Sequence, residues 1–319
     1  MSPPLILAIP SKGRLKDQTE AWLADAGLTL RSQGGARGYS AAVDGFDGLE
    51  VRLASAADIS ASLAVGEVHL GITGEDLLRE IGDIEQRARL LLALGFGRAD
   101  LVVAAPRGWI DVEVMADVDD VAHDILARTG RRLRIATKYP NQTRAFFAAH
   151  GIADYRIVDS GGATEGGPAA GLAELIVDIS TTGATLAANG LKILSDGLIL
   201  ASQARLAASV AAAWDPAQLS LAQRLLAVIE ARARGRTVAS LIWPKAQDRA
   251  ARAALAAFSH PAKSERANGA LIERADLFAA TGALAAAGVG PVSVTQPIYV
   301  FEAASAAGER LAAAVRKSA

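Results

Sequence analysis

The sequence predicts an α/β protein with mostly parallel sheets, followed by a smaller α+β domain. Two observations predict the α/β part. Short apolar strands alternate with helices of about 8–12 residues, as in proteins built from strand–helix–strand units. Runs such as 175–179 are apolar except for one acid, which is typical of strands covered on both faces. The length of 319 residues allows two or three domains with a large buried core.

The strands and helices expected before residue 236 follow from this alternation. The expected strands are 5–10, 51–54, 68–72, 90–94, 101–105, 133–136, 155–159, 175–179 and 192–200. The expected helices are 15–26, one capped by Asp58, one opened by Glu75 and Asp76, 118–128, 141–149, 184–188 and 216–235.

Local signals fix the ends of several of these helices. Gly27, Gly130 and Gly151 stand where helices are expected to stop. Acids in the first turn, such as Glu75 and Asp76, suit the helix dipole. Asp215 as N-cap, with Pro at the first helical position and Gln at the third, predicts a capping box.

The chain from residue 236 onward follows a different order. The expected elements are strand 237–243, helix 247–258, strand 269–273, helix 276–287, and strands 291–294 and 298–301. This order approximates the βαββαβ order of a ferredoxin-like domain. A further helix, 303–315, follows the last strand.

Composition narrows the class of protein. The net charge of −1 favours neither nucleic acid nor membrane as a partner. The absence of cysteine excludes disulfides and thiolate chemistry. No apolar stretch reaches the ~20 residues of a membrane span, and no signal peptide precedes the first strand, so we expect a cytoplasmic protein. The four histidines lack the spacing of metal ligands and are expected to be structural: His69, His123, His150 and His260.

The turn after strand 175–179 predicts an anion site. Thr181, Thr182 and Thr185 offer hydroxyl donors around Gly183, and a helix is expected from Ala184, whose first N–H groups lack partners. Asp178, just before the turn, can accept hydrogen bonds from sugar hydroxyls. The stretch therefore indicates a sugar phosphate, although an ordinary helix cap explains the same residues. No Lys follows the Gly, so this is not a Walker A loop. No GxGxxG is present either, so the dinucleotide-binding fingerprint is absent.

Two other turns are candidates for ligand contact. Lys12-Gly13-Arg14 lies between a strand and a helix, where two cations suit phosphate; a solvated loop is the alternative. Residues 160–168 hold four glycines and Glu165, which favours close approach of backbone to a ligand over a simple connector.

Five motifs, in order, resemble the ATP phosphoribosyltransferase family, the first enzymes of histidine biosynthesis. Four of them are Pro10-Ser-Lys-Gly-Arg-Leu15, Leu70-Gly-Ile-Thr-Gly-Glu-Asp76, Ala136-Thr-Lys-Tyr-Pro140 and the glycine-rich segment around Glu165. The fifth, 176–188, is similar to the family's loop for phosphoribosyl pyrophosphate. Together they cover about residues 5–200.

The resemblance implies a fold and a reaction. It implies a two-lobed core like a periplasmic binding protein, with lobe I at 1–96 completed by 191–235 and lobe II at 97–190. It implies transfer of the phosphoribosyl group to N1 of ATP, with release of pyrophosphate and with Mg²⁺ carried mainly on substrate phosphates. The expected substrate contacts are Asp178 and Glu165 for ribose, Thr181, Thr182, Gly183, Ala184 and Thr185 for the 5′-phosphate, and Lys12, Gly13 and Arg14 for pyrophosphate or ATP. No acid–base residue is assigned.

The resemblance also implies regulation and assembly. Long members of the family carry a ferredoxin-like domain that binds histidine as a feedback inhibitor, which residues 236–319 would match; a domain serving only assembly is the alternative. Dimers that assemble into hexamers are expected. Two other classes stay open: a non-catalytic sensor of small anions, and a regulatory subunit that kept the fold and lost the loop.

Overall fold

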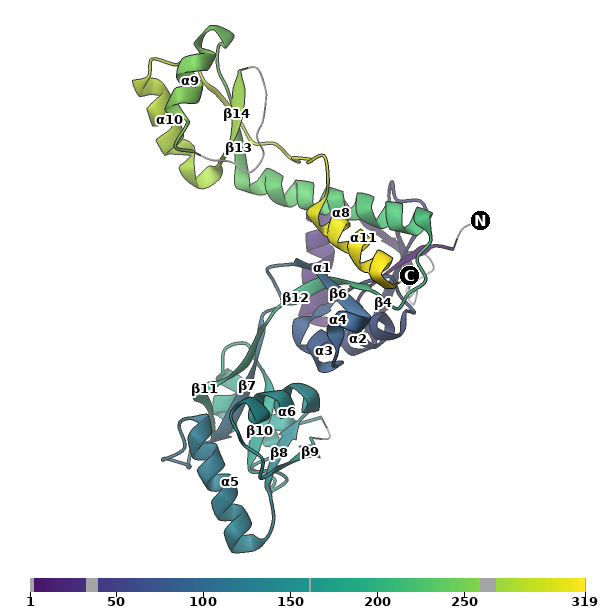
Figure 1. Ribbon diagram of the computed structural model, residues 1–319, viewed down its shortest axis with the longest axis vertical. Helices are drawn as coiled ribbons and strands as arrows, with labels where there is room; N and C mark the ends of the chain where they lie inside the picture. Colours follow the sequence, from purple (N-terminus) through teal and green to yellow (C-terminus); the bar gives the residue numbers. More distant parts are fainter. Residues whose placement is uncertain (1–2, 33–39, 161, 259–267, 319) are drawn as a thin grey trace.

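The computed structural model describes residues 3–32, 40–160, 162–258 and 268–318. Figure 1 shows three bodies along the long axis: lobe I in the middle, lobe II at the bottom and a C-terminal domain at the top. Helix α8 (Pro216–Thr237) runs from lobe I to the C-terminal domain. The predicted two-lobed α/β core with an added α+β domain is confirmed. No helix in the described ranges is both long and apolar enough to cross a membrane.

Lobe I is built on a seven-stranded sheet of order β2-β3-β4-β1-β5-β12-β6. Its strands are β1 (Leu5–Pro10), β2 (Leu30–Ser32), β3 (Ser40–Val43), β4 (Leu49–Ala54), β5 (Leu70–Gly74), β6 (Ala88–Ala93) and β12 (Ala204–Ser209). Helices α1 (Gly13–Asp25), α8 and α11 (Ala306–Ser318) contribute to the core on one face. Helices α2 (Ala56–Val65), α3 (Glu75–Glu80) and α4 (Ile84–Arg87) pack on the other.

Lobe II is built on a five-stranded sheet of order β11-β7-β10-β8-β9. Its strands are β7 (Ala99–Pro106), β8 (Leu133–Thr137), β9 (Tyr155–Asp159), β10 (Leu175–Ser180) and β11 (Leu191–Ser202). Helices α5 (Met115–Thr129) and α6 (Pro140–Ala149) cover one face. The five-residue α7 (Ala184–Ala188) lies on the opposite face. Strand β10 is therefore covered on both sides, as its apolar sequence predicts.

Several sequence-based expectations need correction. The sheets are mixed rather than mostly parallel, since β12 and β7 each pair antiparallel with both neighbours. Residues 191–202, expected to belong to lobe I, form β11 and pair with β7 in lobe II; the chain re-enters lobe I after Ser202, as β12. Helix α2 is capped by Ser55, whose Oγ accepts from the Asp58 N–H over 3.1 Å, so Asp58 lies inside the helix.

The C-terminal domain contains a three-stranded antiparallel sheet of order β14-β13-β15. Its elements are β13 (Val238–Ile242), α9 (Asp248–Ala254), β14 (Gly269–Glu273), α10 (Leu277–Ala286) and β15 (Ser293–Thr295). Both helices pack on one face of this sheet. Strands β13, β14 and β15 have the order and directions of the first, third and fourth strands of a ferredoxin-like sheet. Residues 259–267, between α9 and β14, lie outside the described residues.

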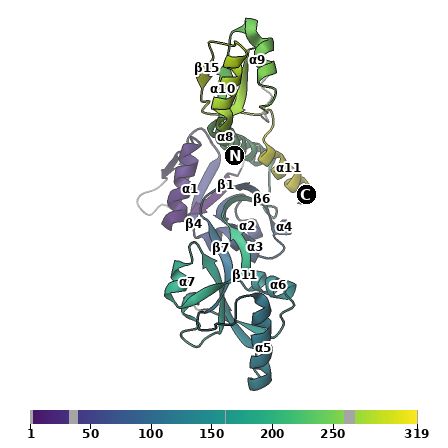
Figure 2. The same cartoon turned by 90° about the vertical axis from the view of Figure 1, so that its left-hand side faces the viewer.

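The segment after β15 differs from the prediction of a strand at 298–301. It runs along α8 without joining a sheet: the Val300 N–H donates to the Ala231 carbonyl over 2.9 Å, and Arg234 Nε donates to the Val300 carbonyl over 2.9 Å. Gly235 does not end α8, which continues to Thr237; instead its missing side chain lets the Ile298 carbonyl lie 2.5 Å from where a Cβ would stand. The chain then returns to lobe I as α11, beside α8 in Figures 1 and 2.

Candidate functional site

The turn between β10 and α7 is held by its own side chains. Ser180 Oγ accepts the Gly183 N–H over 2.9 Å, and Thr182 Oγ1 accepts the Ala184 N–H over 3.4 Å. Gly183 has a φ of 76°, in the left-handed region where a side chain is strained. Two amides therefore lie next to hydroxyl groups in a tight turn, and α7, with only five residues, adds little macrodipole.

This turn and two carboxylates line one cavity of about 290 Å³. The lining residues are Glu165, Asp178, Ile179, Ser180, Thr181, Thr182, Gly183, Ala184, Thr185 and Leu186. The structure thus brings together Glu165, Asp178 and all five residues predicted for the phosphate loop. Ser180 was not predicted, although its place at the end of the strand marks it as a turn residue.

The charge of Glu165 acts on Asp178. Burial raises the pKa of Asp178, and the charge of Glu165 raises it further. The Ile179 N–H, which donates to Asp178 Oδ1 over 2.8 Å, and the positive charge of Lys138 oppose this rise. A ligand that donates hydroxyls or carries positive charge to this cavity would relieve the cost of ionising Asp178.

Lys138, which the sequence analysis names only as part of a motif, acts on the site through its charge, although it does not line the cavity. It follows β8, which pairs parallel with β10, so it leaves the sheet at the same edge as Asp178. Its Nζ donates to the Gly162 carbonyl over 3.4 Å, and its charge acts on Asp178. The signal that could have identified it is a cation directly after a strand that neighbours the phosphate-loop strand.

Glu165 is positioned by a compact turn. It lies in the short 3-10 helix η1 (Thr164–Gly166), where Thr164 is buried. A Cβ on Gly167 would stand 3.1 Å from the Thr164 carbonyl and 3.4 Å from Ala136 Cβ. A glycine at this position therefore lets the segment lie close against β8.

Lys12, Gly13 and Arg14 lie on the other lobe. They are exposed at the end of β1, where the Ser11 N–H donates to the Ala54 carbonyl over 2.8 Å. Gly13 has a φ of 72° and opens α1. The three residues do not line the 290 Å³ cavity. Leu15 lies against Gly97, where the chain crosses between the lobes, so this turn is close to the hinge.

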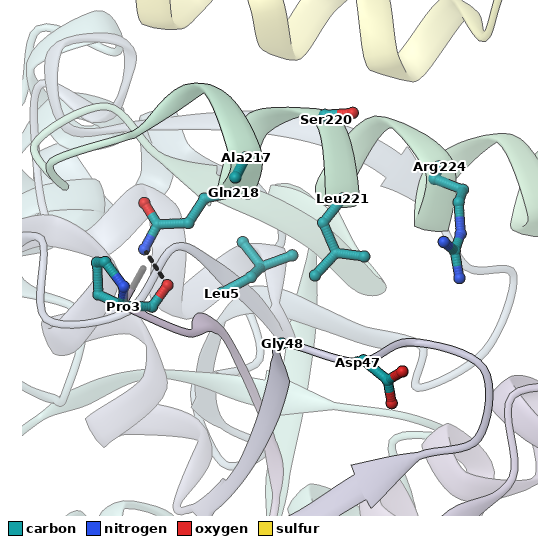
Figure 3. A pocket seen from close by; sticks show the side chains of 9 residues that line it. All are labelled: Pro3, Leu5, Asp47, Gly48, Ala217, Gln218, Ser220, Leu221 and Arg224. Carbon is teal, nitrogen blue, oxygen red and sulfur yellow. Dashed lines mark hydrogen bonds between the residues drawn. The ribbon is translucent and has the colours of Figure 1, made fainter. Parts of the chain in front are cut away.

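A larger cavity, of about 410 Å³, lies on lobe I between α8 and the start of β1 (Figure 3). Its polar side chains are largely engaged with the main chain. Gln218 Nε2 donates to the Pro3 and Pro4 carbonyls over 3.2 and 3.1 Å, and Arg224 donates to the Gly45 carbonyl. Among the described residues that line it, only Asp47 is a carboxylate and only Ser220 carries a hydroxyl.

The predicted structural histidines have structural partners where they are described. His69 is buried; its Nδ1 accepts the Ile6 N–H over 3.1 Å, and burial lowers its pKa. His123 lies in helix α5, and His150 is the residue directly after helix α6. His260 lies outside the described residues. Within the described ranges, no three acids or histidines gather as metal ligands.

Comparison with known proteins gives consistent results. The family model described as "ATP phosphoribosyltransferase" matches residues 55–231. The chain is 65% identical over 317 residues to an ATP phosphoribosyltransferase of Caulobacter vibrioides, covering 99% of both chains. It is 58% identical over 235 residues to that of Rhodopseudomonas palustris, covering 73% of this chain and 72% of the relative.

A solved structure also matches. It is the ATP phosphoribosyl transferase (HisG:HisZ) complex from Thermotoga maritima, with a TM-score of 0.51 and 28% identity. The match covers 71% of this chain and 98% of the Thermotoga chain. Nearly three tenths of the present chain therefore have no counterpart in that match.

Proposed function

This chain belongs to the ATP phosphoribosyltransferase family, and on that premise we propose that Thr181–Thr185 binds the 5′-phosphate of phosphoribosyl pyrophosphate. The enzyme transfers the phosphoribosyl group of that substrate to N1 of the adenine ring of ATP and releases pyrophosphate, the first step of histidine biosynthesis. The observation that carries the assignment is that a single cavity holds the hydroxyl-rich turn together with Asp178 and Glu165.

The two carboxylates suit the ribose hydroxyls. Each can accept a hydrogen bond, and Asp178 is half-buried beside Glu165, so donated hydroxyls would stabilise its ionised form. The phosphate would take up the Gly183 and Ala184 amides in place of the Ser180 and Thr182 hydroxyls. Because those hydroxyls are freed in the exchange, they become additional donors to the phosphate.

Pyrophosphate departure calls for positive charge. N1 of adenine is a neutral nucleophile that needs no strong base; as its bond to C1 forms, the bond from C1 to the pyrophosphate oxygen breaks with its electron pair. We assign Lys138 of lobe II, with Lys12 and Arg14 of lobe I, to the phosphates that carry this charge. Lys12 and Arg14 reach them only when the lobes approach each other.

The described part of the site offers Mg²⁺ only a few protein ligands. Two carboxylates, Glu165 and Asp178, line the cavity, while the full ligand set of a protein-held metal is absent from the described residues. This donor set suits Mg²⁺ held mainly by the substrate's own phosphates, where the ion supplies charge against the pyrophosphate. We place the reaction in the cytoplasm, where ATP is available.

The C-terminal domain is proposed as a feedback domain that binds histidine, with a role only in assembly as the alternative. It is joined to lobe I twice, by α8 and by the returning segment that ends in α11. Such a double connection can transmit a change in the domain to the catalytic lobe. We also propose a homo-oligomer, a dimer that assembles into a hexamer.

The test is pyrophosphate release from ATP and phosphoribosyl pyrophosphate with magnesium, with and without millimolar histidine. Turnover suppressed by histidine supports both the site and the feedback domain. Turnover indifferent to histidine leaves assembly as the role of the domain. Folded protein without turnover would revive the sensor and the regulatory-subunit hypotheses.

A further inference from the structure

Lobe I supplies the helix cap for α6 of lobe II. The Glu80 carboxylate, on α3, accepts the Asn141 N–H over 2.7 Å and the Gln142 N–H over 3.2 Å. The residue before α6, Tyr139, provides no side-chain cap of its own. Helix N-termini need acceptors for their first N–H groups, and a carboxylate there also suits the dipole. The start of α6 therefore depends on a residue from the other lobe.

A buried hydrogen bond lies beside this cap. Tyr139 Oη donates to Asp76 Oδ2 over 2.7 Å, and both side chains are buried. The other oxygen, Asp76 Oδ1, accepts from Ser202 Oγ over 2.8 Å. Gln142 Nε2 donates to the Asp76 carbonyl over 2.9 Å. Both carboxylate oxygens of this buried lobe I acid are thus satisfied by hydroxyl donors of lobe II, from Tyr139 and from Ser202 at the end of β11.

The contact lies at the hinge. Ser202 is the last residue of β11, the strand by which the chain leaves lobe II. The next residue, Gln203, accepts the Glu75 N–H through its carbonyl over 3.0 Å and the Gly95 N–H through Oε1 over 3.0 Å. Groups next to a hinge move least when two lobes rotate. A contact here can persist while Lys12 and Arg14, exposed at the end of β1, move toward lobe II.

The same contact positions a substrate-facing residue. Tyr139 directly follows Lys138, which leaves β8 toward the cavity of Asp178 and Glu165. Fixing the Tyr139 ring and the first turn of α6 fixes the main chain from which Lys138 extends. An error of about 1 Å in such a position can lower a rate by a factor of about 100.

From these contacts we infer that Tyr139 and Glu80 are positioning residues, which with Asp76 form a pivot between the lobes. The hydrogen bonds of this pivot stay formed throughout the reaction. They hold Lys138 and lobe II in the productive orientation. The inference rests on the proposed roles of Lys138 and the phosphate loop. The opposite possibility is a latch of the open form that must break when the lobes close. The two possibilities predict opposite changes in kinetics.

The kinetic test uses Tyr139→Phe in the full chain, with pyrophosphate release as the readout. A pivot predicts a fall in kcat of about tenfold with the KM for phosphoribosyl pyrophosphate within about twofold of the unmodified chain. The control is Tyr155→Phe, a half-buried tyrosine of lobe II that packs on Phe147, and it leaves both constants unchanged. A lower KM in Tyr139→Phe would establish the latch, and unchanged constants would remove Tyr139 from the mechanism.

A second variant and a second readout keep the outcome decisive. Glu80→Ala removes the cap of α6 at a half-buried position and replaces Tyr139→Phe in the test if that variant fails to fold. The pivot predicts the same fall in kcat for Glu80→Ala. Hydrogen exchange of the Asn141 and Gln142 amides needs no turnover. A pivot predicts that phosphoribosyl pyrophosphate with Mg²⁺ does not speed their exchange, whereas faster exchange on binding overturns the proposal. Pyrophosphate release by the unmodified chain tests the proposed function separately.

Discussion

The Gly183 N–H donates to Ser180 Oγ over 2.9 Å, so the phosphate loop is already folded around one of its own hydroxyls. The positive φ of Gly183, 76°, makes this turn possible. A phosphate entering the turn would meet the Gly183 and Ala184 amides in a backbone that is already fixed by hydrogen bonds to side-chain hydroxyls. The loop therefore loses little conformational entropy on binding.

Gly183→Ala is expected to weaken substrate binding through the backbone alone. The nearest atom to its Cβ would be Ile193 Cδ1 at 3.8 Å, so space is available and only the left-handed φ is costly. We expect a stability loss of about 1 kcal/mol and a several-fold higher KM for phosphoribosyl pyrophosphate. Gly190→Ala is the matched control: its φ is 69°, its Cβ site is open, and it lies outside the cavity. Equal KM changes in both variants would contradict the assignment.

Asp178→Asn is expected to stabilise the free protein while impairing it as an enzyme. The pKa of Asp178 is raised in the folded state by burial and by Glu165. Below the ordinary Asp pKa of about 3.9 both states are protonated and no penalty exists. The penalty builds up as the pH rises from this value to the raised folded pKa, because the unfolded chain loses its proton first, and it is complete above the folded pKa. The thermal midpoint at pH 7 should therefore be higher for Asp178→Asn than for the unmodified chain, and this difference should vanish at low pH. A higher midpoint that persists at low pH would refute the electrostatic cause.

Lys138→Gln is expected to affect the substrate rather than the fold. Removing this charge takes one cation from the phosphates and lets the pKa of Asp178 rise further. We expect kcat/KM for phosphoribosyl pyrophosphate to fall about tenfold or more, as for loss of a charged group that stabilises a transition state. Arg132→Gln, an exposed change in the same lobe, should leave kcat/KM unchanged. Matching activities of the two variants would exclude Lys138 from the site.

Gly235→Ala tests the segment that runs along α8. By helix propensity alone, alanine inside a helix stabilises by about 0.5–1 kcal/mol. Here the new Cβ would stand 2.5 Å from the Ile298 carbonyl and 2.9 Å from that of Pro297, so we expect a lower thermal midpoint. Gly282→Ala, in α10 with open space around its Cβ site, should instead raise the midpoint. A stabilising Gly235→Ala would show that the segment does not pack as described.

Local signals predict the catalytic lobes well. The strand–turn–helix at 175–188 appears as β10, a glycine turn and α7, because apolar runs, Gly183 and helix-forming alanines all act within a few residues. The capping box at Asp215 forms as predicted, with the Gln218 N–H donating to Asp215 Oδ1 over 2.7 Å. Glu165 and Asp178, which the family resemblance assigns to ribose, line one cavity, and their roles stay a prediction.

Features set by distant contacts could not be predicted in the same way. The apolar run 298–301 has the composition of a strand, yet it joins no sheet, and the Val300 N–H donates to the Ala231 carbonyl of α8. Strand β11 joins lobe II because β7 offers an antiparallel edge, which its own sequence does not encode. The contact of Tyr139 with Asp76 joins residues 63 positions apart, so only the fold brings them together.

The most direct test of the central claim is titration calorimetry of phosphoribosyl pyrophosphate with Mg²⁺ into the unmodified chain and into Asp178→Ala. Binding by the unmodified chain, weakened at least tenfold in Asp178→Ala while its far-ultraviolet circular dichroism is unchanged, is the result our assignment predicts. Equal affinity for both proteins would contradict it and move the substrate site away from the cavity of Asp178, Glu165 and the phosphate loop.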